Sequence, residues 1–161
     1  MIDMVDDSGM RDWWDLNRLM VRYAKACDSF NWTDYRGLFT DDAWIDYSRA
    51  YGRAGTPDEI TRWMPTIMNP ASLPHTQHML ANLNVEVAGD AAMGEAYYLN
   101  PDVVAGPGGK RLLINGGQYR FSARREAGAW RLARLEAELY WSTQGELIDI
   151  LALELTSPAQ S

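Results

Sequence analysis

The second half of the chain is a succession of alternating apolar and polar segments separated by turn residues, and this pattern limits the possible folds most. Strict alternation is typical of half-buried β-strands. The first segment, "HMLANLNVEV", is predicted to place five side chains on one face: Met79, Ala81, Leu83, Val85 and Val87. A second strand, "GDAAMGEAYYLN", opens on a Gly-Asp turn, and the loop "GPGG" (106–109) separates it from the next.

Two longer segments complete the strand-rich half. "KRLLINGGQYRFSARRE" and "AWRLARLEAELYW" are predicted to form a long hairpin that turns around "EAGA". Alternation in the second strand places Leu135, Ala137, Leu139 and Trp141 on one face and Arg134, Glu136 and Glu138 on the other. The charged face is interpreted as solvated surface or as a polar contact between subunits. "GELIDILALEL" is predicted to be a closing helix or an extended arm.

The first half of the chain carries helical signals. An amphipathic helix is predicted to start after an N-cap at Asp12 and to end near "CDSFNW", with an apolar stripe at helical spacing: Leu16, Leu19, Met20, Tyr23 and Cys27. A short helix "TDYRGLF" capped by Thr33 and a strand "AWIDYS" follow. A further capped helix starts at "TPDEITRWM", with Pro57 at its first position, and Pro65, Pro70 and Pro74 limit its length.

Helices followed by antiparallel strands predict an α+β domain, in which helices pack on one face of a curved sheet. A sheet that curls around helices leaves a cavity between the layers, which is a natural ligand site. The length of 161 residues suits one domain, and no repeat or linker divides the chain. We therefore expect a single domain over residues 1–161.

Composition excludes several classes of partner. The net charge of −7, without a basic cluster, argues against nucleic acid. No apolar run is long enough to cross a bilayer, and the N-terminus lacks the pattern of a secretion signal. A single cysteine, Cys27, rules out an internal disulfide and fits a reducing compartment. We therefore expect a cytoplasmic protein that binds neither nucleic acid nor membrane.

The two histidines, His75 and His78, lie in "LPHTQHML". An HxxH pair supplies two metal ligands at most, and the chain has no third histidine and no acidic residue nearby in sequence. We therefore expect no metal. Cys27 on an apolar helix face is predicted to be an inert buried thiol, no GxSxG motif is present, and "GPGG" opens no helix that could bind phosphate.

General acid-base chemistry remains. A neutral histidine is the usual proton carrier, and it works best when a carboxylate holds its other ring nitrogen. Asp28 follows directly after the buried stripe of the first helix, so it is the interesting carboxylate. It is also open to interpretation as an ordinary helix-terminal or turn-forming aspartate. Asp46 and Tyr47 alternate along their strand, so only one of them faces the interior.

The stretch from residue 22 to 48, the "HTQHML" segment and the closing hairpin resemble the SnoaL-like branch of the nuclear transport factor 2-like superfamily, and scytalone dehydratase in particular. The resemblance covers about residues 11–142. It implies a cone-shaped α+β barrel, in which N-terminal helices pack on a strongly curved sheet and enclose a pocket. The matching motifs are "DSFNW", "IDYS" and "TQH", which put Asp28, Tyr47 and His78 at the family's functional positions.

The resemblance implies a cofactor-independent lyase that performs a dehydratase-type elimination on a small cyclic, aromatic or polyketide-like molecule. His78 would be the base, Asp28 would orient it, and Tyr47, with Tyr23 as a second donor, would bind the developing enolate. His75 lies outside the matched motif and is expected in a loop or at the pocket rim. The apolar wall is expected to come from tryptophans, for which the candidates are Trp32, Trp44, Trp63 and Trp141.

The chain departs from that family at two points. The family's second histidine, on a later strand, has no counterpart in "LINGGQYRF", where Asn115 or Gln118 would have to serve. Cys27 stands where the dehydratase has a tyrosine. Two alternatives remain: a non-catalytic ligand-binding or assembly domain, and a ketosteroid-type isomerase, whose oxyanion donor Tyr23 matches but whose base position falls at Tyr47. The resemblance also implies a homo-oligomer, with a trimer favoured over a dimer.

Overall fold

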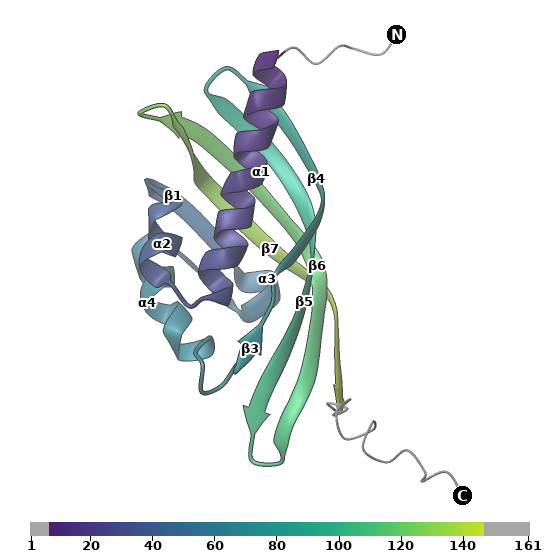
Figure 1. Ribbon diagram of the computed structural model, residues 1–161. Coiled ribbons are helices and arrows are strands. Elements are labelled where there is room, and N and C mark those ends of the chain that lie inside the picture. The colour runs from purple at the N-terminus through teal and green to yellow at the C-terminus, as the bar shows by residue number, and fades with distance from the viewer. Residues whose placement is uncertain (1–6, 147–161) are drawn as a thin grey trace, which may run out of the picture.

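The computed structural model describes residues 7–146, which form four helices and a seven-stranded sheet (Figure 1). The helices are α1 (Asp7–Asp28), α2 (Trp32–Gly37), α3 (Ser48–Tyr51) and α4 (Pro57–Ile67). The strands are β1 (Phe39–Tyr47), β2 (Arg53–Gly55), β3 (His75–Thr76), β4 (Met79–Ala88), β5 (Ala91–Gly106), β6 (Gly109–Glu126) and β7 (Ala129–Glu146). The closing helix or arm was expected from residue 145 onward. Residues 145 and 146 belong to β7, and the rest of that segment lies outside the described residues.

The sheet is strongly curved and holds α1 across its inner face, while α2, α3 and α4 close one end (Figure 1). Its strand order is β2-β1-β7-β6-β5-β3, with β4 also paired to β5. All pairs are antiparallel except β1 with β7. The predicted α+β architecture of helices on a curved sheet is therefore confirmed. No helix within residues 7–146 combines the length and hydropathy of a membrane span.

Helix α1 forms because its apolar residues recur every three or four positions and meet the sheet as one stripe. The predicted stripe is confirmed, since each of its members is at most 3% exposed: Leu16, Leu19, Met20, Tyr23 and Cys27. The predicted N-cap is wrong, because α1 begins at Asp7 and Asp12 lies inside it. The Asp12 carboxylate instead accepts hydrogen bonds from Arg125 (2.7 Å) and Trp130 (3.3 Å), so a tertiary contact explains the residue.

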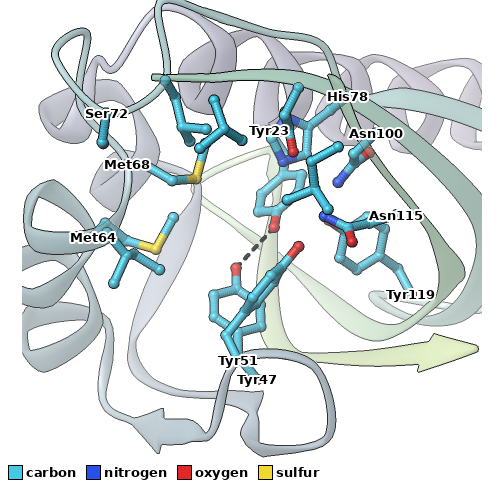
Figure 2. A pocket seen from close by; sticks show the side chains of 15 residues that line it. Tyr23, Tyr47, Tyr51, Met64, Met68, Ser72, His78, Asn100, Asn115 and Tyr119 are labelled. Atoms are coloured by element: carbon cyan, nitrogen blue, oxygen red, sulfur yellow. Dashed lines mark hydrogen bonds between the residues drawn. The ribbon is translucent and has the colours of Figure 1, made fainter. Parts of the chain in front are cut away.

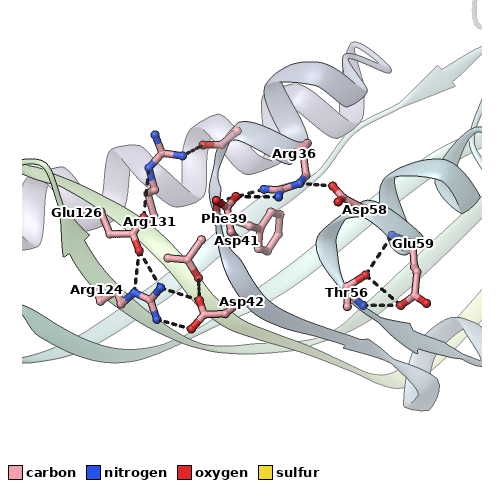
Figure 3. Close-up of polar contacts among 12 residues, drawn as sticks. Arg36, Phe39, Asp41, Asp42, Thr56, Asp58, Glu59, Arg124, Glu126 and Arg131 are labelled. Atoms are coloured by element: carbon pink, nitrogen blue, oxygen red, sulfur yellow. Dashed lines mark hydrogen bonds and ion pairs between the residues drawn. The ribbon is translucent and has the colours of Figure 1, made fainter.

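The short helices show which caps the chain uses. Helix α2 is capped by Asn31, whose side chain accepts from the backbone N–H of Asp34, and the predicted cap at Thr33 is therefore wrong. Helix α4 starts as predicted, with Thr56 and Glu59 in a capping box (Figure 3). The α2 residue Arg36 also pairs with Asp58 of α4 at 2.5 Å, which joins the two helices (Figure 3).

Strand β4 departs from the predicted alternation. The register with β5 shifts between Ala81 and Asn84, at Asn82, whose φ of 53° lies in the left-handed region. This bulge inserts an extra residue, so the side chains before and after it exchange faces. The side chains that pack on the core are therefore Leu80, Leu83 and Val85, and the prediction that Met79 and Ala81 share the face of Leu83 and Val85 is wrong. Val87 keeps that face, opposite the buried Ala92, but is 37% exposed.

Strand β5 runs further than predicted, through Asn100 to Gly106, and the "GPGG" loop shrinks to a tight turn before β6. Pro101 is tolerated inside this strand because of its position. On one side β4 last pairs with β5 at Leu99, and β3 first pairs with it at Asp102, so Pro101 lies in the gap between the two. A proline that has no ladder bond to donate costs the sheet little there. The extension carries β5 along the whole cavity.

The β6–β7 hairpin turns around "EAGA" as predicted, at Ala127 (φ 49°) and Gly128 (φ 81°). Further along, the register shifts at Gly116 and Gly117, which leaves Tyr140 as an extra residue in β7. The bulge turns Trp141 to the outer face of the sheet. The prediction that Trp141 shares the inner face with Leu135, Ala137 and Leu139 is therefore wrong.

Candidate active site

A cavity of about 270 Å³ lies between the inner face of the sheet and the helices at its closed end. Its walls divide by chemistry. One side is apolar. Most of its side chains come from α4 and the segment after it, namely Met64, Ile67, Met68 and Leu73, and the sheet adds Val104 and Leu113. The opposite side is polar, with tyrosine, histidine, asparagine and aspartate side chains (Figure 2). A volume near the lower end of the usual range for ligand pockets fits a small, largely apolar ring.

His78 and Asp28 meet at the polar side of this cavity. Asp28 is the last residue of α1, and His78 stands directly before β4, which packs against α1. The His78 Nδ1 and the Asp28 Oδ1 are 2.6 Å apart. The Asp28 carboxylate also accepts the backbone N–H of His78, at 2.9 Å to Oδ1 and 3.1 Å to Oδ2. One carboxylate thus holds both the ring and the backbone of His78.

This geometry fixes the chemistry of the imidazole. A carboxylate oxygen at Nδ1 favours the tautomer that carries the proton there, which leaves Nε2 with a lone pair. The His78 side chain is only 6% exposed and lines the cavity, whereas the Asp28 side chain is 29% exposed. Edge contact with the Tyr23 ring, at 6.4 Å between centroids, further restrains the imidazole. The arrangement can accept a proton from a bound molecule and stabilise the resulting cation.

Three buried tyrosine hydroxyls form a chain beside the histidine. Tyr47 hydrogen-bonds to both Tyr23 and Tyr35, each at 2.8 Å (Figure 2 shows the Tyr23–Tyr47 bond). Burial raises the pKa of all three phenols well above the ordinary value. They therefore remain protonated at neutral pH and act as hydrogen-bond donors. Tyr23 and Tyr47 line the cavity, so one end and the middle of this hydrogen-bonded series lie at the cavity wall.

Cys27, next to Asp28 at the end of α1, is fully buried. Burial, with a smaller contribution from the charge of Asp28, raises the pKa of its thiol well above the usual range. A thiol that stays protonated is a poor nucleophile, so the predicted inert cysteine agrees with its environment. Within the described part of the chain, no group of three or more His, Cys, Asp or Glu side chains is arranged to hold a metal ion. His75 is an exposed residue of β3 and does not line the cavity.

The structure separates the two amides proposed for the later strand. Asn115 is 6% exposed and lines the cavity, and its Oδ1 accepts a hydrogen bond from Ser142, so its N–H groups are left as donors. Gln118 does not line the cavity. It bonds instead to Glu95 and Tyr140, side chains of the opposite sheet face. Of the two, Asn115 is the residue whose position suits ligand contact.

The expected tryptophan wall is wrong: the described residues that line the cavity include no tryptophan. Trp32 stacks edge-on against Tyr35, and Trp63 receives the Arg53 guanidinium on its ring. Trp44 and Trp141 are 42% and 49% exposed, respectively. Residue type alone did not reveal which face of its helix or strand each one occupies, and methionine, isoleucine, leucine and valine side chains form the apolar wall instead.

Five polar residues of the cavity were not predicted: Tyr51, Ser72, Tyr119, Asn100 and Asp102. Asn100 is 1% exposed and Asp102 is 8% exposed. A signal for the last two was present in the sequence. They continue the inward parity of Ala96 and Tyr98 along β5, so polar residues fall where alternation demands buried ones. The strand was predicted to end at Asn100, and the inward position of Asp102 was therefore missed.

Comparisons with known proteins agree with this fold. The chain matches the SnoaL-like domain over residues 10–136. An uncharacterized protein of Mycobacterium tuberculosis is 31% identical over 131 residues, which cover 81% of this chain and 87% of the mycobacterial protein. A candidate aromatic ring hydroxylase of Novosphingobium aromaticivorans has a solved structure with 25% identity and a TM-score of 0.73, covering 87% of this chain and 96% of that one.

Two further solved structures share the fold at lower identity. A candidate scytalone dehydratase of Novosphingobium aromaticivorans is 19% identical, with a TM-score of 0.75 over 88% of this chain and 93% of that one. A type 3 hexachlorocyclohexane dehydrochlorinase of Novosphingobium barchaimii is 17% identical, with a TM-score of 0.72 over 88% and 93%. The match over residues 10–136 covers most of the chain, and the chain therefore belongs to the SnoaL-like domain family.

Proposed function

We propose that the protein is a cofactor-independent lyase of the dehydratase type, acting on a small cyclic, aromatic or polyketide-like molecule. The observation that carries this proposal is the 2.6 Å contact between His78 Nδ1 and Asp28 Oδ1 at the wall of an apolar cavity. A non-catalytic binding domain has no need for a buried imidazole held by a carboxylate with one nitrogen left toward the ligand. The contact therefore favours catalysis over simple binding.

In the proposed reaction, His78 Nε2 removes a proton from the carbon next to a carbonyl group of the substrate. The electron pair of that C–H bond forms an enolate, then a C=C bond as the leaving group departs from the neighbouring carbon with its bonding pair. The imidazolium returns its proton to a departing hydroxide, so that water leaves and the enzyme is restored. Asp28 orients the ring and stabilises the imidazolium.

The tyrosine hydroxyls would stabilise the enolate oxygen. Tyr23 and Tyr47 stand at the cavity as protonated phenols, and their bonds with each other and with Tyr35 use two of the three hydroxyl protons. Tyr23 or Tyr47 would donate the remaining proton in a buried setting, where a hydrogen bond to a developing negative charge is stronger than in water. The same property weighs against the isomerase alternative. That reaction would need a base at Tyr47, and burial raises the pKa of this phenol well above the ordinary value, so its basic form is scarce at neutral pH.

The test is proton removal itself, measured by exchange of α-hydrogens for deuterium in cyclic ketones such as 1-tetralone, with NMR as the readout. Dehydration is followed in parallel with 3-hydroxy-1-tetralone, whose loss of water yields the aromatic 1-naphthol. We expect His78→Gln to abolish both activities with the fold retained. The matched control is His75→Gln, which removes an exposed histidine outside the cavity and should keep full activity. Wild-type turnover by folded His78→Gln would refute the proposal.

We also propose that the protein assembles as a homo-oligomer, and that a trimer is favoured. Support comes from the outer face of the sheet, where Met79 pairs with Leu99, Leu99 with Gly116 and Gly116 with Trp141, in one row across four strands. The three large side chains of this row are 46%, 38% and 49% exposed. A contiguous apolar row on a sheet face is typical of a subunit contact.

A further inference from the structure

Four buried side-chain oxygens within residues 7–146 lack a hydrogen-bond partner. Two are threonine hydroxyls, of Thr61 and Thr76, and neither residue lines the cavity. The other two are Asn100 Oδ1 and Asp102 Oδ1, and both of these residues do line it. Thr76 lies opposite Asp102 in the β3–β5 register, and its side chain and the Gln77 backbone interact with the Asp102 carboxyl group, but Asp102 Oδ1 has no partner. Buried acceptors are nearly always paired, so the unpaired oxygens of Asn100 and Asp102 at one cavity wall indicate partners that come from a bound molecule.

The two acceptors lie next to each other because side chains alternate between the two faces of β5. Residues 100 and 102 are two positions apart in β5, so their side chains leave the same face, about 6.6–6.8 Å apart along the strand. Pro101 between them faces the opposite way. The bulk of both side chains is buried, at 1% and 8% exposure, so bulk water does not satisfy them.

Neighbouring groups add donors to these acceptors. Asn115 lies opposite Asn100 in the β5–β6 register, with its Oδ1 already occupied by Ser142 and its N–H groups available. Tyr51 lies close to both acceptor residues: burial and the Asp102 charge raise the pKa of Tyr51 to about 12, and the Asn100 side chain opposes them. Acceptors and donors side by side match a hydroxyl group, which both donates and accepts.

We infer that Asn100 and Asp102 are specificity-determining residues that bind hydroxyl groups of the ligand, so that this cavity selects a hydroxylated ring over a halogenated one. A carbon–chlorine bond has no proton to donate, so a chlorinated ring would leave both acceptors buried and unpaired. Sites built to bind a hydroxyl group reject analogues that lack it far more strongly than they reject a change of size. The preference for binding hydroxylated rings does not depend on the proposed lyase reaction. Only the conversion of such a ring into product rests on the proposed function.

The test compares binding without turnover. Benzenediols and naphthalenediols with different hydroxyl spacings are titrated into the full-length wild type, each beside its dichloro counterpart, and the dissociation constants are measured by ligand-detected NMR. We expect the best diol to bind about tenfold or more tightly than its dichloro counterpart. Asn100→Leu and Asp102→Leu should each reduce that ratio toward one. The matched control, Asn84→Leu, removes an exposed amide from the outer face of β4 and should keep the ratio.

Conservative variants and stability separate recognition from a structural role. Asp102→Asn keeps an acceptor oxygen and should keep the preference. The melting temperatures of the ligand-free variants show that each leucine variant is folded before its binding ratio is compared with that of the wild type. Equal binding of diols and dichloro compounds by the wild type, or an unchanged ratio in both leucine variants, would overturn the inference. His78→Gln should retain the preference while losing proton exchange. A wild type with the preference and no proton exchange would refute the lyase and leave this inference standing.

Discussion

Asp28 makes every one of its three described hydrogen bonds to a single residue, His78. This gives the carboxylate two tasks, which are to place the start of β4 against the end of α1 and to hold the imidazole. The interpretation of Asp28 as an ordinary turn-forming aspartate accounts for neither the ring contact nor the distance of 50 residues along the chain. The role of Asp28 in orienting the imidazole was predictable from its motif. Its second role, in holding the backbone of His78, was not.

Replacing the charge while keeping the shape tests the second task. In Asp28→Asn, the amide oxygen still accepts the His78 backbone N–H, so we expect the melting temperature to change little. The imidazolium loses its partner, and the rate should fall about a hundredfold or more, mainly in kcat. Steady-state kinetics and thermal unfolding together check this expectation. An unchanged rate would mean that the carboxylate serves only to position the backbone.

A second residue-scale prediction concerns pH and stability. Burial raises the pKa of the Asp102 carboxyl, and the neighbouring Thr76 and His78 side chains only partly oppose it. The native state therefore holds this proton more tightly than the unfolded chain does. As pH rises above the ordinary carboxyl value, the unfolded chain releases this proton before the native state does, so the stability of the native state falls.

The variant Asp102→Asn lacks this ionisation. Its melting temperature minus that of the wild type should therefore become more positive between about pH 4 and pH 7. Because the charges of His78 and Asp28 also act on Asp102, the same comparison is repeated in a His78→Gln background. A difference that stays constant with pH in both backgrounds would contradict the expectation.

At the scale of elements, the chain's local signals predicted what local physics decides. Helical periodicity, the cap before Pro57 and the turn around "EAGA" are fixed by residues close in sequence, and the structure confirms them. The bulges in β4 and β7 and the passage of β5 through Pro101 depend on neighbouring strands instead. The bulges decide which side chains of β4 and β7 lie on the inner face of the sheet, and the extension of β5 brings Asn100 and Asp102 to the cavity. The register was therefore the part of the site that the sequence did not reveal.

The bulge in β7 makes two adjacent glycines of β6 unequal. A Cβ at Gly117 would lie 2.0 Å from the Glu138 carbonyl oxygen and 2.6 Å from the Tyr98 hydroxyl. A Cβ at Gly116 would meet only the Trp141 ring, which is half exposed and free to tilt. We expect Gly117→Ala to destabilise the protein by about 1–3 kcal/mol, and Gly116→Ala to cost clearly less. Denaturant unfolding of both variants gives the comparison, and equal losses would contradict it.

At the scale of the whole molecule, the site is assembled from four helices and strands and one loop. Tyr23 comes from α1, Tyr47 from β1, Asp102 from β5 and Asn115 from β6, with His78 just before β4. The motifs identified Asp28, Tyr47 and His78 from the sequence. The remaining polar wall, at Asn100 and Asp102, became visible only once the sheet was in place.

The outer row of the sheet gives a prediction at this scale. Light scattering should show an oligomer at micromolar concentration. Leu99→Lys places a charge in the middle of the row and should shift the protein toward monomer, because a buried unpaired charge disfavours association. The control Met10→Lys adds the same charge at an exposed methionine of α1 and should leave the assembly intact. A monomeric wild type would contradict the proposed assembly.

The one parallel pairing of the sheet joins β1 near the start of the chain to β7 at its described end. Apart from the three-residue β2, β1 has no other strand beside it, so its long edge stays open until residues 129–146 have been synthesised. During translation, the apolar side chains of β1 and the unpaired backbone next to them are therefore exposed while some eighty residues are added. A nascent chain on a ribosome stalled before that point would expose an incomplete, aggregation-prone sheet, and we expect it to depend on chaperones.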